Sequence, residues 1–179
     1  MNKQILSEII FCQKCKLNKN CKSPIPWTWN INSKILFIKV SPTEEDDSNQ
    51  ELFTTKSDKI LKDVLSNVWL NIDQDYYVTS LIKCYNSESN NINDAGNSSY
   101  IKKCESYLFR QINEIKPKII IPIWKEPFSY FIPDRDINDN IYKIMRIAWL
   151  KWVEFERWYR PLLFPILSPS LIIYNKSKK

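Results

Sequence analysis

The stretch from Tyr76 to Cys84, YYVTSLIKC, is rich in β-branched and aromatic residues, and it predicts a buried strand with a cysteine at its carboxyl end. Ligands in open α/β sheets bind at the carboxyl ends of the strands, so Cys84 is well placed for a functional role. A C-x-x-C motif lies upstream at Cys12 and Cys15, and Cys104 follows downstream in a segment with helical periodicity. Together these four thiols predict a metal site.

Strand and helix patterns alternate along the rest of the chain. Further buried strands are predicted at 34–40 (KILFIKV), 117–123 (PKIIIPI) and 162–167. Helices are predicted at 1–11, 56–69, 100–115 and 124–131. Strands that alternate with helices favour a parallel sheet that is covered on both faces.

Two segments leave alternatives open. The apolar residues between 141 and 160 fit the stripe of a helix, whereas 147–158 also fits an aromatic hairpin. The acidic run 43–47 (TEEDD) follows the first predicted strand, where an active site would lie. The same run also fits a solvated loop that caps the next helix.

Composition narrows the chemistry. Lys and Arg total 26 against 20 for Asp and Glu, which gives a net charge of +6 and a pI near 9.0. This excess favours an anionic partner such as nucleic acid over a merely basic surface. The chain has no histidine, and Gly96 is its only glycine. These two absences exclude imidazole catalysis and a glycine-rich phosphate loop.

The chain is expected to form a single domain over 1–179, with a core large enough to do without disulfides. It has neither a signal peptide nor an apolar run that could span a bilayer, so we expect an intracellular (cytoplasmic) protein without membrane contact. The five cysteines are then expected to be metal ligands or free thiols. For Cys21 an ordinary half-buried thiol is favoured over a ligand.

Six motifs, in the same order along the chain, match those of one family. They are Cys12, Cys15 and Leu17; the strand end and acidic run 39–46 (KVSPTEED); 52–55 (LFTT); 77–84 (YVTSLIKC); a helix with Cys104, Leu108, Gln111 and Ile112 followed by 116–118 (KPK); and 168–172 (SPSLI). On these motifs the chain resembles the iron–sulfur type of uracil-DNA glycosylase, known as family four, over nearly its whole length.

The resemblance implies a three-layer α/β/α sandwich with a four-stranded parallel sheet, and it favours strand pairing within 147–158. It also implies a [4Fe–4S] cluster on Cys12, Cys15, Cys84 and Cys104, although four thiolates also suit zinc. DNA contacts are implied for loops at the strand ends, with Phe53 as a stacking aromatic. The DNA-binding residues expected on this basis are Phe53, Ser80, Ser168, Ser170 and Leu171.

The departures from the family pattern fall on its chemistry. Val40 replaces a glutamate associated with water activation, Ser80 an asparagine that binds uracil, and Ser168 a histidine that stabilises the departing base. Three family glycines are replaced by Lys39, Thr43 and Thr55. Loss of one general acid or base typically costs about 10²–10⁴ in rate, so little glycosylase activity is expected.

Three functions are consistent with these observations. The favoured one is a catalytically inactive, glycosylase-like accessory subunit that binds single-stranded or primer-template DNA together with a replication or repair protein, such as a polymerase or primase. The second is a working glycosylase in which Glu44, Asp46 or Asn90 replaces the lost groups. The third is a metal-stapled protein-interaction module whose partner surface is the aromatic segment 149–159.

Overall fold

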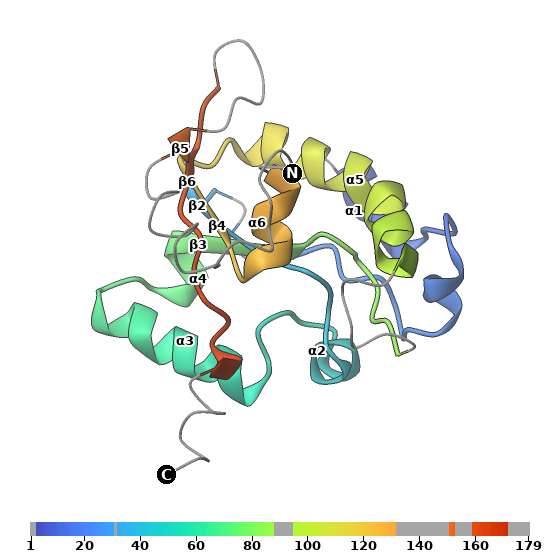
Figure 1. Ribbon diagram of the computed structural model, residues 1–179, viewed down its shortest axis with the longest axis horizontal. Helices are drawn as coiled ribbons and strands as arrows, with labels where there is room; N and C mark the ends of the chain where they lie inside the picture. The colour runs from blue at the N-terminus through green and yellow to red at the C-terminus, as the bar shows by residue number, and fades with distance from the viewer. Residues whose placement is uncertain (1–2, 31, 88–94, 132–150, 153–158, 172–179) are drawn as a thin grey trace.

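The computed structural model describes residues 3–30, 32–87, 95–131, 151–152 and 159–171 (Figure 1). The helices are α1 (Lys3–Ile10), the 3-10 helix η1 (Lys16–Lys19), α2 (Glu44–Asn49), α3 (Lys56–Asn67), α4 (Ile72–Asp75), α5 (Ala95–Ile115) and α6 (Lys125–Phe131). The strands are β1 (Thr28–Trp29), β2 (Ile35–Lys39), β3 (Tyr76–Ser80), β4 (Ile119–Pro122), β5 (Lys151–Trp152) and β6 (Leu162–Leu163). Within these ranges, no helix is both long and apolar enough to cross a membrane.

The strands form one sheet in the order β1-β3-β2-β4-β6-β5. The four inner strands run parallel, which confirms the predicted four-stranded parallel sheet. The short strands β1 and β5 pair antiparallel with the two outer members of this set. Because the inner strands are parallel, their carboxyl ends all lie at one edge of the sheet.

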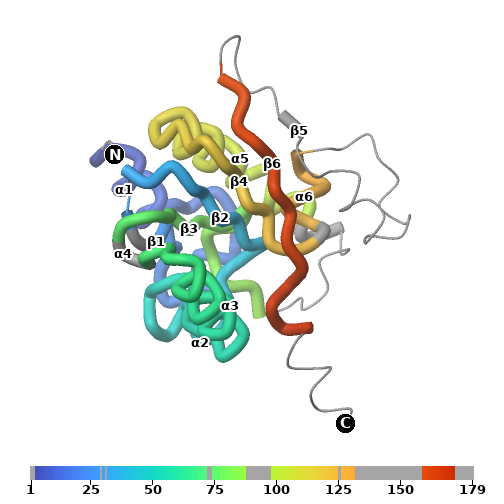
Figure 2. Tube along the Cα trace, turned by 90° about the vertical axis from the view of Figure 1, so that its left-hand side faces the viewer, coloured from blue at the N-terminus to red at the C-terminus, as the bar shows by residue number. Residues whose placement is uncertain are grey.

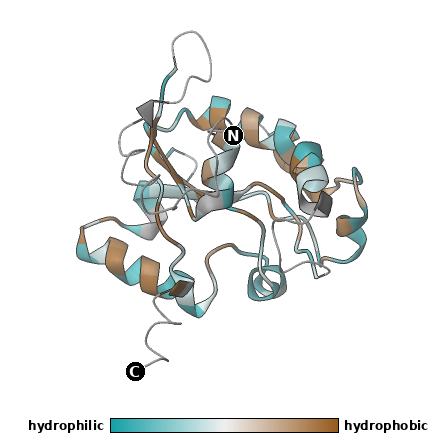
Figure 3. Ribbon diagram, viewed as in Figure 1, coloured by the Kyte–Doolittle hydropathy of each residue, from teal (hydrophilic) through white to brown (hydrophobic). Residues whose placement is uncertain are grey.

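Both faces of the sheet are covered, as the three-layer prediction requires (Figure 2). One face packs against α5 and α6 in a core that includes Leu36, Ile120, Leu108, Ile112 and Phe128. The other face packs against α3 and the loop before it in a core that includes Phe37, Val78, Leu52, Phe53 and Leu65. Hydrophobic strands therefore lie between helices that carry both hydrophobic and hydrophilic residues (Figure 3).

The strand predicted at 76–84 is shorter than expected. β3 ends at Ser80, so Cys84 lies beyond the strand and not at its carboxyl end. The amides of Leu81 and Ile82 still donate to the carbonyls of Lys39 and Val40 at 2.9 Å, after which the chain turns away. Lys83 holds this turn, because its buried Nζ donates back to the Ser80 carbonyl at 2.6 Å.

The acidic run forms a helix of its own, so its interpretation as a solvated loop is wrong. Thr43 and Asp46 make a capping box at the start of α2, and Thr55 and Asp58 make a second one at the start of α3. Carboxylates in a first helical turn are favoured because they accept from free amides at the positive end of the helix dipole. Both capping aspartates are buried, which places them inside the fold.

Strand pairing within 147–158 is confirmed at β5. Its residues Lys151 and Trp152 pair antiparallel with Leu163 and Leu162 of β6. The rest of the segment 141–158 lies outside the described residues, and the alternative helical stripe lies there with it.

Candidate functional site

A cavity of about 270 Å³ lies where β2 and β4 end and α3 begins. Its charged lining residues are Lys39 and Asp58, and its hydroxyl-bearing ones are Ser41, Thr43, Thr55, Ser57, Ser168 and Ser170. The carboxyl edge of a parallel sheet is where open α/β folds bind their ligands. This cavity is therefore the candidate binding site.

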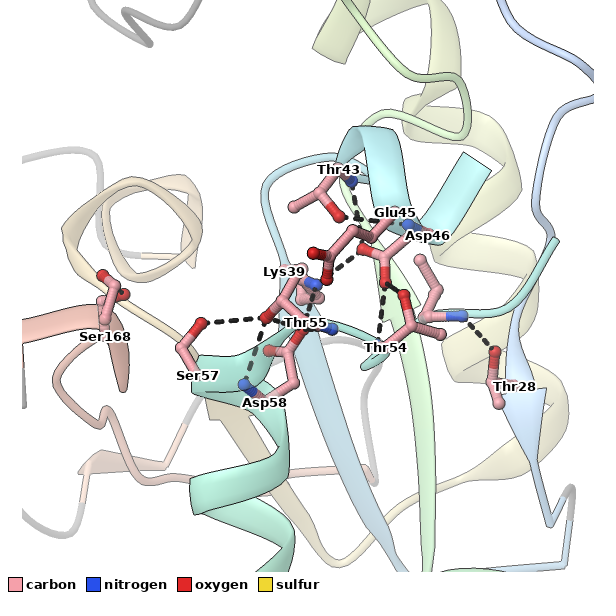
Figure 4. A network of polar contacts seen from close by, with 12 residues as sticks. Thr28, Lys39, Thr43, Glu45, Asp46, Thr54, Thr55, Ser57, Asp58 and Ser168 are labelled. Atoms are coloured by element: carbon pink, nitrogen blue, oxygen red, sulfur yellow. Dashed lines mark hydrogen bonds and ion pairs between the residues drawn. The ribbon is translucent and has the colours of Figure 1, made fainter. Parts of the chain in front are cut away.

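Lys39 crosses the floor of the site and is held by two carboxylates (Figure 4). Its Nζ lies 2.7 Å from Asp46 Oδ2 and 3.0 Å from Asp58 Oδ2. The side chains of all three residues are largely or wholly removed from solvent. One ammonium between two carboxylates leaves this group of three with a net charge of −1, so the cavity floor does not attract phosphate.

Asp46 has its acceptor sites filled by the surrounding loops. Oδ2 also accepts from the Thr43 amide at 3.0 Å, and Oδ1 accepts from the Thr54 amide at 3.0 Å and the Thr54 hydroxyl at 2.8 Å. Burial by itself raises the pKa of Asp46, but the Lys39 charge and these hydrogen bonds outweigh it and lower the pKa below its ordinary value. Asp46 is therefore a buried, ionised structural group.

Phe53 lies beneath Lys39 and is 0% exposed. The Lys39 Nζ is 5.4 Å from the centroid of the Phe53 ring, within the range of a cation–π interaction, and Phe37 packs edge-on against the same ring. Phe53 also adopts a φ of 67°, a left-handed conformation that is unfavourable for a bulky residue. In this arrangement a lysine occupies the face of the ring on which a base was expected to stack.

The five residues expected to contact DNA fall into two groups. Phe53 and Ser80 are fully buried, so neither reaches a nucleic acid in this conformation. The Ser80 hydroxyl is buried without a hydrogen-bond partner in the described part of the chain. Ser168 and Ser170 are half-buried in the cavity lining, where their hydroxyls lie 2.6 Å apart. Leu171 is also half-buried but is not one of the lining residues that the structure describes.

Among the lining residues that the structure describes, no carboxylate is available to activate water. Val40 lines the cavity at the position of the family's glutamate, and Asp58, the only acid among those residues, binds Lys39. Three residues were considered as replacements for the lost catalytic groups. Both oxygens of Asp46 already accept hydrogen bonds, Glu44 is exposed and is not a lining residue, and Asn90 lies outside the described residues. The geometry therefore gives no support to the rearranged glycosylase.

Thiols gather on the other side of β3. Cys21, Cys84 and Cys104 are buried in one cluster with Leu17 and Ile82, and Cys15 packs against it. Cys12 packs in the adjoining cluster beside Tyr107, one helical turn beyond Cys104 on α5. All five cysteines are free thiols.

These donors fit an iron–sulfur cluster in kind, because soft thiolates are the ligands such clusters use. Among the described residues, no three metal-binding side chains lie close enough together to hold a single ion. The structure nevertheless brings Cys15, Cys84 and Cys104 into one region and places Cys12 in the adjoining cluster.

Lys83 joins the thiol cluster to the sheet. Its Nζ donates to Thr79 Oγ1 at 2.7 Å, to the Ser80 carbonyl and to Gln111 Oε1 at 2.8 Å. Burial lowers the pKa of this amine to about 7. Gln111 also donates from Nε2 to the Tyr77 hydroxyl at 3.1 Å, so α5, β3 and the turn before Cys84 share one polar network.

Two features of the site were missed from the sequence. The two carboxylates that bind Lys39 could have been placed from the sequence. Thr43-x-x-Asp46 and Thr55-x-x-Asp58 are both capping-box patterns, which put a carboxylate at the start of a helix. The contact of Cys21 with the other thiols had no such signal, since it depends on how two distant segments pack.

Residues 26–179 match the model of the Uracil DNA glycosylase superfamily. The chain belongs to this superfamily, as its motifs and its parallel sheet predicted. Similar proteins include the type-4 uracil-DNA glycosylase of Saccharolobus solfataricus, which is 29% identical over 171 residues, covering 96% of this chain and 76% of that protein. The type-4 uracil-DNA glycosylase of Archaeoglobus fulgidus is 28% identical over 172 residues, covering 96% of this chain and 82% of that protein.

A relative of another kind is a DNA polymerase of Bacillus phage SP01. It is 30% identical to this chain over 150 residues. These residues make up 84% of this chain but only 15% of the polymerase.

Asp46→Asn is expected to destabilise the fold by about 1–3 kcal/mol, because the amide nitrogen of asparagine cannot accept the buried hydrogen bonds that one Asp46 oxygen accepts in the wild type. The free energy of unfolding from denaturant titration at neutral pH measures this change. The exposed Glu44→Gln removes the same charge from the same helix and should change stability by less than about 0.5 kcal/mol.

The same pair of proteins gives a pH test. Because the pKa of Asp46 is lowered in the fold, its contribution is present above the unfolded pKa near 4 and is lost as the pH falls through the folded value. The difference in free energy of unfolding between wild type and Asp46→Asn should therefore become smaller below about pH 4. A difference that stays constant down to pH 2 would contradict an ionised Asp46.

Proposed function

We propose that this protein is a DNA-binding accessory subunit that has kept the glycosylase fold without base excision. The observation that carries the proposal is the position of Lys39 above Phe53, locked by Asp46 and Asp58. A base could stack on Phe53 only if this buried ion triad came apart. Extruding a base already costs a few kcal/mol, and breaking the triad adds to that cost.

The catalytic positions support the same conclusion. Val40 cannot activate a water, and Ser168 cannot supply the positive charge that a departing uracil anion needs. A closed base site and missing general acid–base groups are independent obstacles, so a single side-chain rearrangement would not restore turnover.

DNA binding is supported by the superfamily and by the net charge of +6. Because the cavity floor is net negative and Phe53 is covered, we expect the strand to lie across the cavity mouth and not inside it. Ser168 and Ser170 line the cavity, Leu171 follows them in the chain, and these three residues would contact sugar and phosphate groups. Such binding suits single-stranded or primer-template DNA and has little preference for uracil over thymine.

A replication protein as partner is supported by the phage DNA polymerase, in which the similar segment is 15% of a much longer chain. We infer that the glycosylase-like fold described here acts together with a polymerase. Its surface offers an apolar patch on α3 and just after it, made of Val64, Val68 and Trp69, and Trp69 is 94% exposed. Exposed tryptophans in such patches are typical of protein interfaces.

This patch also favours the interaction-module hypothesis over the rearranged glycosylase. That hypothesis placed the partner surface at 149–159, of which only residues 151–152 and 159 are described. A protein that binds a partner but no DNA remains the competing function, and the DNA-binding experiment below separates the two.

We further propose a [4Fe–4S] cluster held by Cys12, Cys15, Cys84 and Cys104. When bound, such a cluster would tie the N-terminal segment to the sheet and to α5 as a structural centre. Protein purified without oxygen is expected to be brown and to contain about four iron and four sulfide per chain. Cys84→Ala should lose the colour and much of its stability. A colourless wild type with one zinc would instead establish the zinc site.

Uracil release should be undetectable from single-stranded uracil DNA, because the base site is closed and its catalytic groups are absent. The measurement is alkaline cleavage of a labelled oligonucleotide after incubation with the anaerobically purified protein. Turnover that disappears in the exposed variant Glu44→Gln but not in the exposed control Lys103→Ala would establish an active glycosylase instead.

DNA binding should be detectable at low salt and fall steeply with added salt, with a slope of about −0.7 in log K against log [salt] for each phosphate contacted. Ser170→Glu is expected to weaken binding about fivefold to tenfold, since a carboxylate near a phosphate costs roughly 1 kcal/mol or more. Fluorescence anisotropy with a labelled oligonucleotide measures both effects.

Ser66→Glu is the matched control, because it adds the same charge at an exposed serine near the far end of α3. If Ser66→Glu and Ser170→Glu weaken DNA binding equally, the DNA does not bind at the cavity mouth. Absence of DNA binding both for the chain alone and for its complex with a polymerase would favour the interaction module.

A further inference from the structure

The residue that follows the segment of β4 brings a tryptophan into the cavity. Trp124 lines the cavity together with Ser168 and Ser170, and it is half-buried, so part of the residue stays accessible. Among the lining residues that the structure describes, Trp124 is the only aromatic one. Because Lys39 covers the ring of Phe53, Trp124 is the aromatic residue of this site that is left for contact with a ligand.

The backbone of Trp124 is held in a conformation that suits glycine. Its φ is 80°, in the left-handed region, where a bulky residue is unfavourable because its Cβ clashes with the backbone. The amide of Trp124 donates to the Ile166 carbonyl at 2.9 Å, and the amide before it donates to the Ile38 carbonyl at 2.9 Å. The turn is thus fixed by β2 and by the segment after β6, and glycine would adopt it at a lower cost than tryptophan.

Packing in the cores does not account for the tryptophan either. In the described part of the chain, the hydrophobic clusters on the two faces of the sheet do not include Trp124. Backbone strain of this kind is found mainly at functional sites. A strained tryptophan that belongs to neither core and lines the cavity is therefore a candidate for a binding role.

The position of Trp124 beside the two serines fits a strand of DNA. β4 and β6 lie side by side, and beyond them Ile123 forms a parallel bridge with Ile166 (Figure 2). The end of β4 therefore runs next to the segment that leads to Ser168 and Ser170. A nucleotide whose sugar and phosphate contact these hydroxyls would have its base near Trp124.

We propose that Trp124 is the stacking residue of this site and binds a base of single-stranded DNA. This inference rests on the proposed DNA-binding function and adds to it the residue that contacts a base. Every base has a π-face, so stacking on an indole agrees with little preference for uracil over thymine. The base does not have to reach the face of Phe53, so the ion triad around Lys39 stays intact.

The experiment measures binding of the full chain, purified without oxygen, to a labelled oligonucleotide of thymidines by fluorescence anisotropy at low salt. Trp124→Gly removes the ring and suits the left-handed backbone, so the fold should be kept. Its affinity should fall by about fivefold or more, which is the loss expected for one stacked base. Trp124→Phe keeps an aromatic ring and should bind more tightly than Trp124→Gly.

Gln50→Gly is the backbone control. Gln50 also has a left-handed conformation, with a φ of 55°, and it is not one of the described lining residues. Its replacement should leave the affinity at the wild-type value. Thermal unfolding checks that each variant is folded, and if Trp124→Gly is not, Trp124→Leu removes the ring while keeping an apolar side chain, with the same expected loss.

An abasic strand of the same length separates stacking from contacts with the DNA backbone. Wild type should bind it several-fold more weakly than the thymidine strand, and Trp124→Gly should show a smaller difference between the two. Equal affinity of wild type and Trp124→Gly for the thymidine strand would overturn the stacking role. So would an equal loss in Trp124→Gly and Gln50→Gly. A wild type that binds neither strand would instead refute the proposed DNA binding itself.

Discussion

The ammonium of Lys39 lies between two buried carboxylates, and the loops at the carboxyl edge of the sheet are arranged around it. Asp46 binds the amides of Thr43 and Thr54 while it binds Lys39, so it ties the start of α2 to the loop that carries Phe53. Asp58 ties the start of α3 to the same amine. Because buried charges must be paired, these segments cannot move independently.

How far the sequence predicts this structure depends on the range of the interactions involved. The parallel sheet could be predicted from segments such as KILFIKV and PKIIIPI. Their consecutive apolar residues indicate strands that are buried on both faces. The end of β3 could not be located in this way, because the turn after Ser80 depends on a bond from buried Lys83 to Gln111 on another element. The burial of Phe53 likewise depends on packing against distant residues such as Phe37 of β2 and Leu65 of α3.

The sequence predicted which residues belong to the candidate site better than it predicted how they contact one another. Cys84 and Cys104, which the motifs grouped with Cys15, do share one buried cluster against which Cys15 packs, whereas their role as metal ligands stays a prediction. Cys21 was assigned no partner, because nothing in its local sequence indicates that the turn after η1 packs against the turn after β3. Tertiary packing decides such contacts, and a single sequence carries little direct information about it.

The ion triad also limits how this chain can change over time. Replacing Lys39 alone by glycine would reopen the space above Phe53, but it would leave Asp46 and Asp58 buried side by side without a counter-charge. Replacing either aspartate first would leave Lys39 paired with the other one, but it would leave backbone amides at the start of α2 or of α3 without their acceptor. Opening the space above Phe53 thus requires substitutions at more than one of these three positions. Because each of them is costly when it occurs alone, the chemistry of the cavity floor is harder to alter by stepwise mutation than that of the exposed surface.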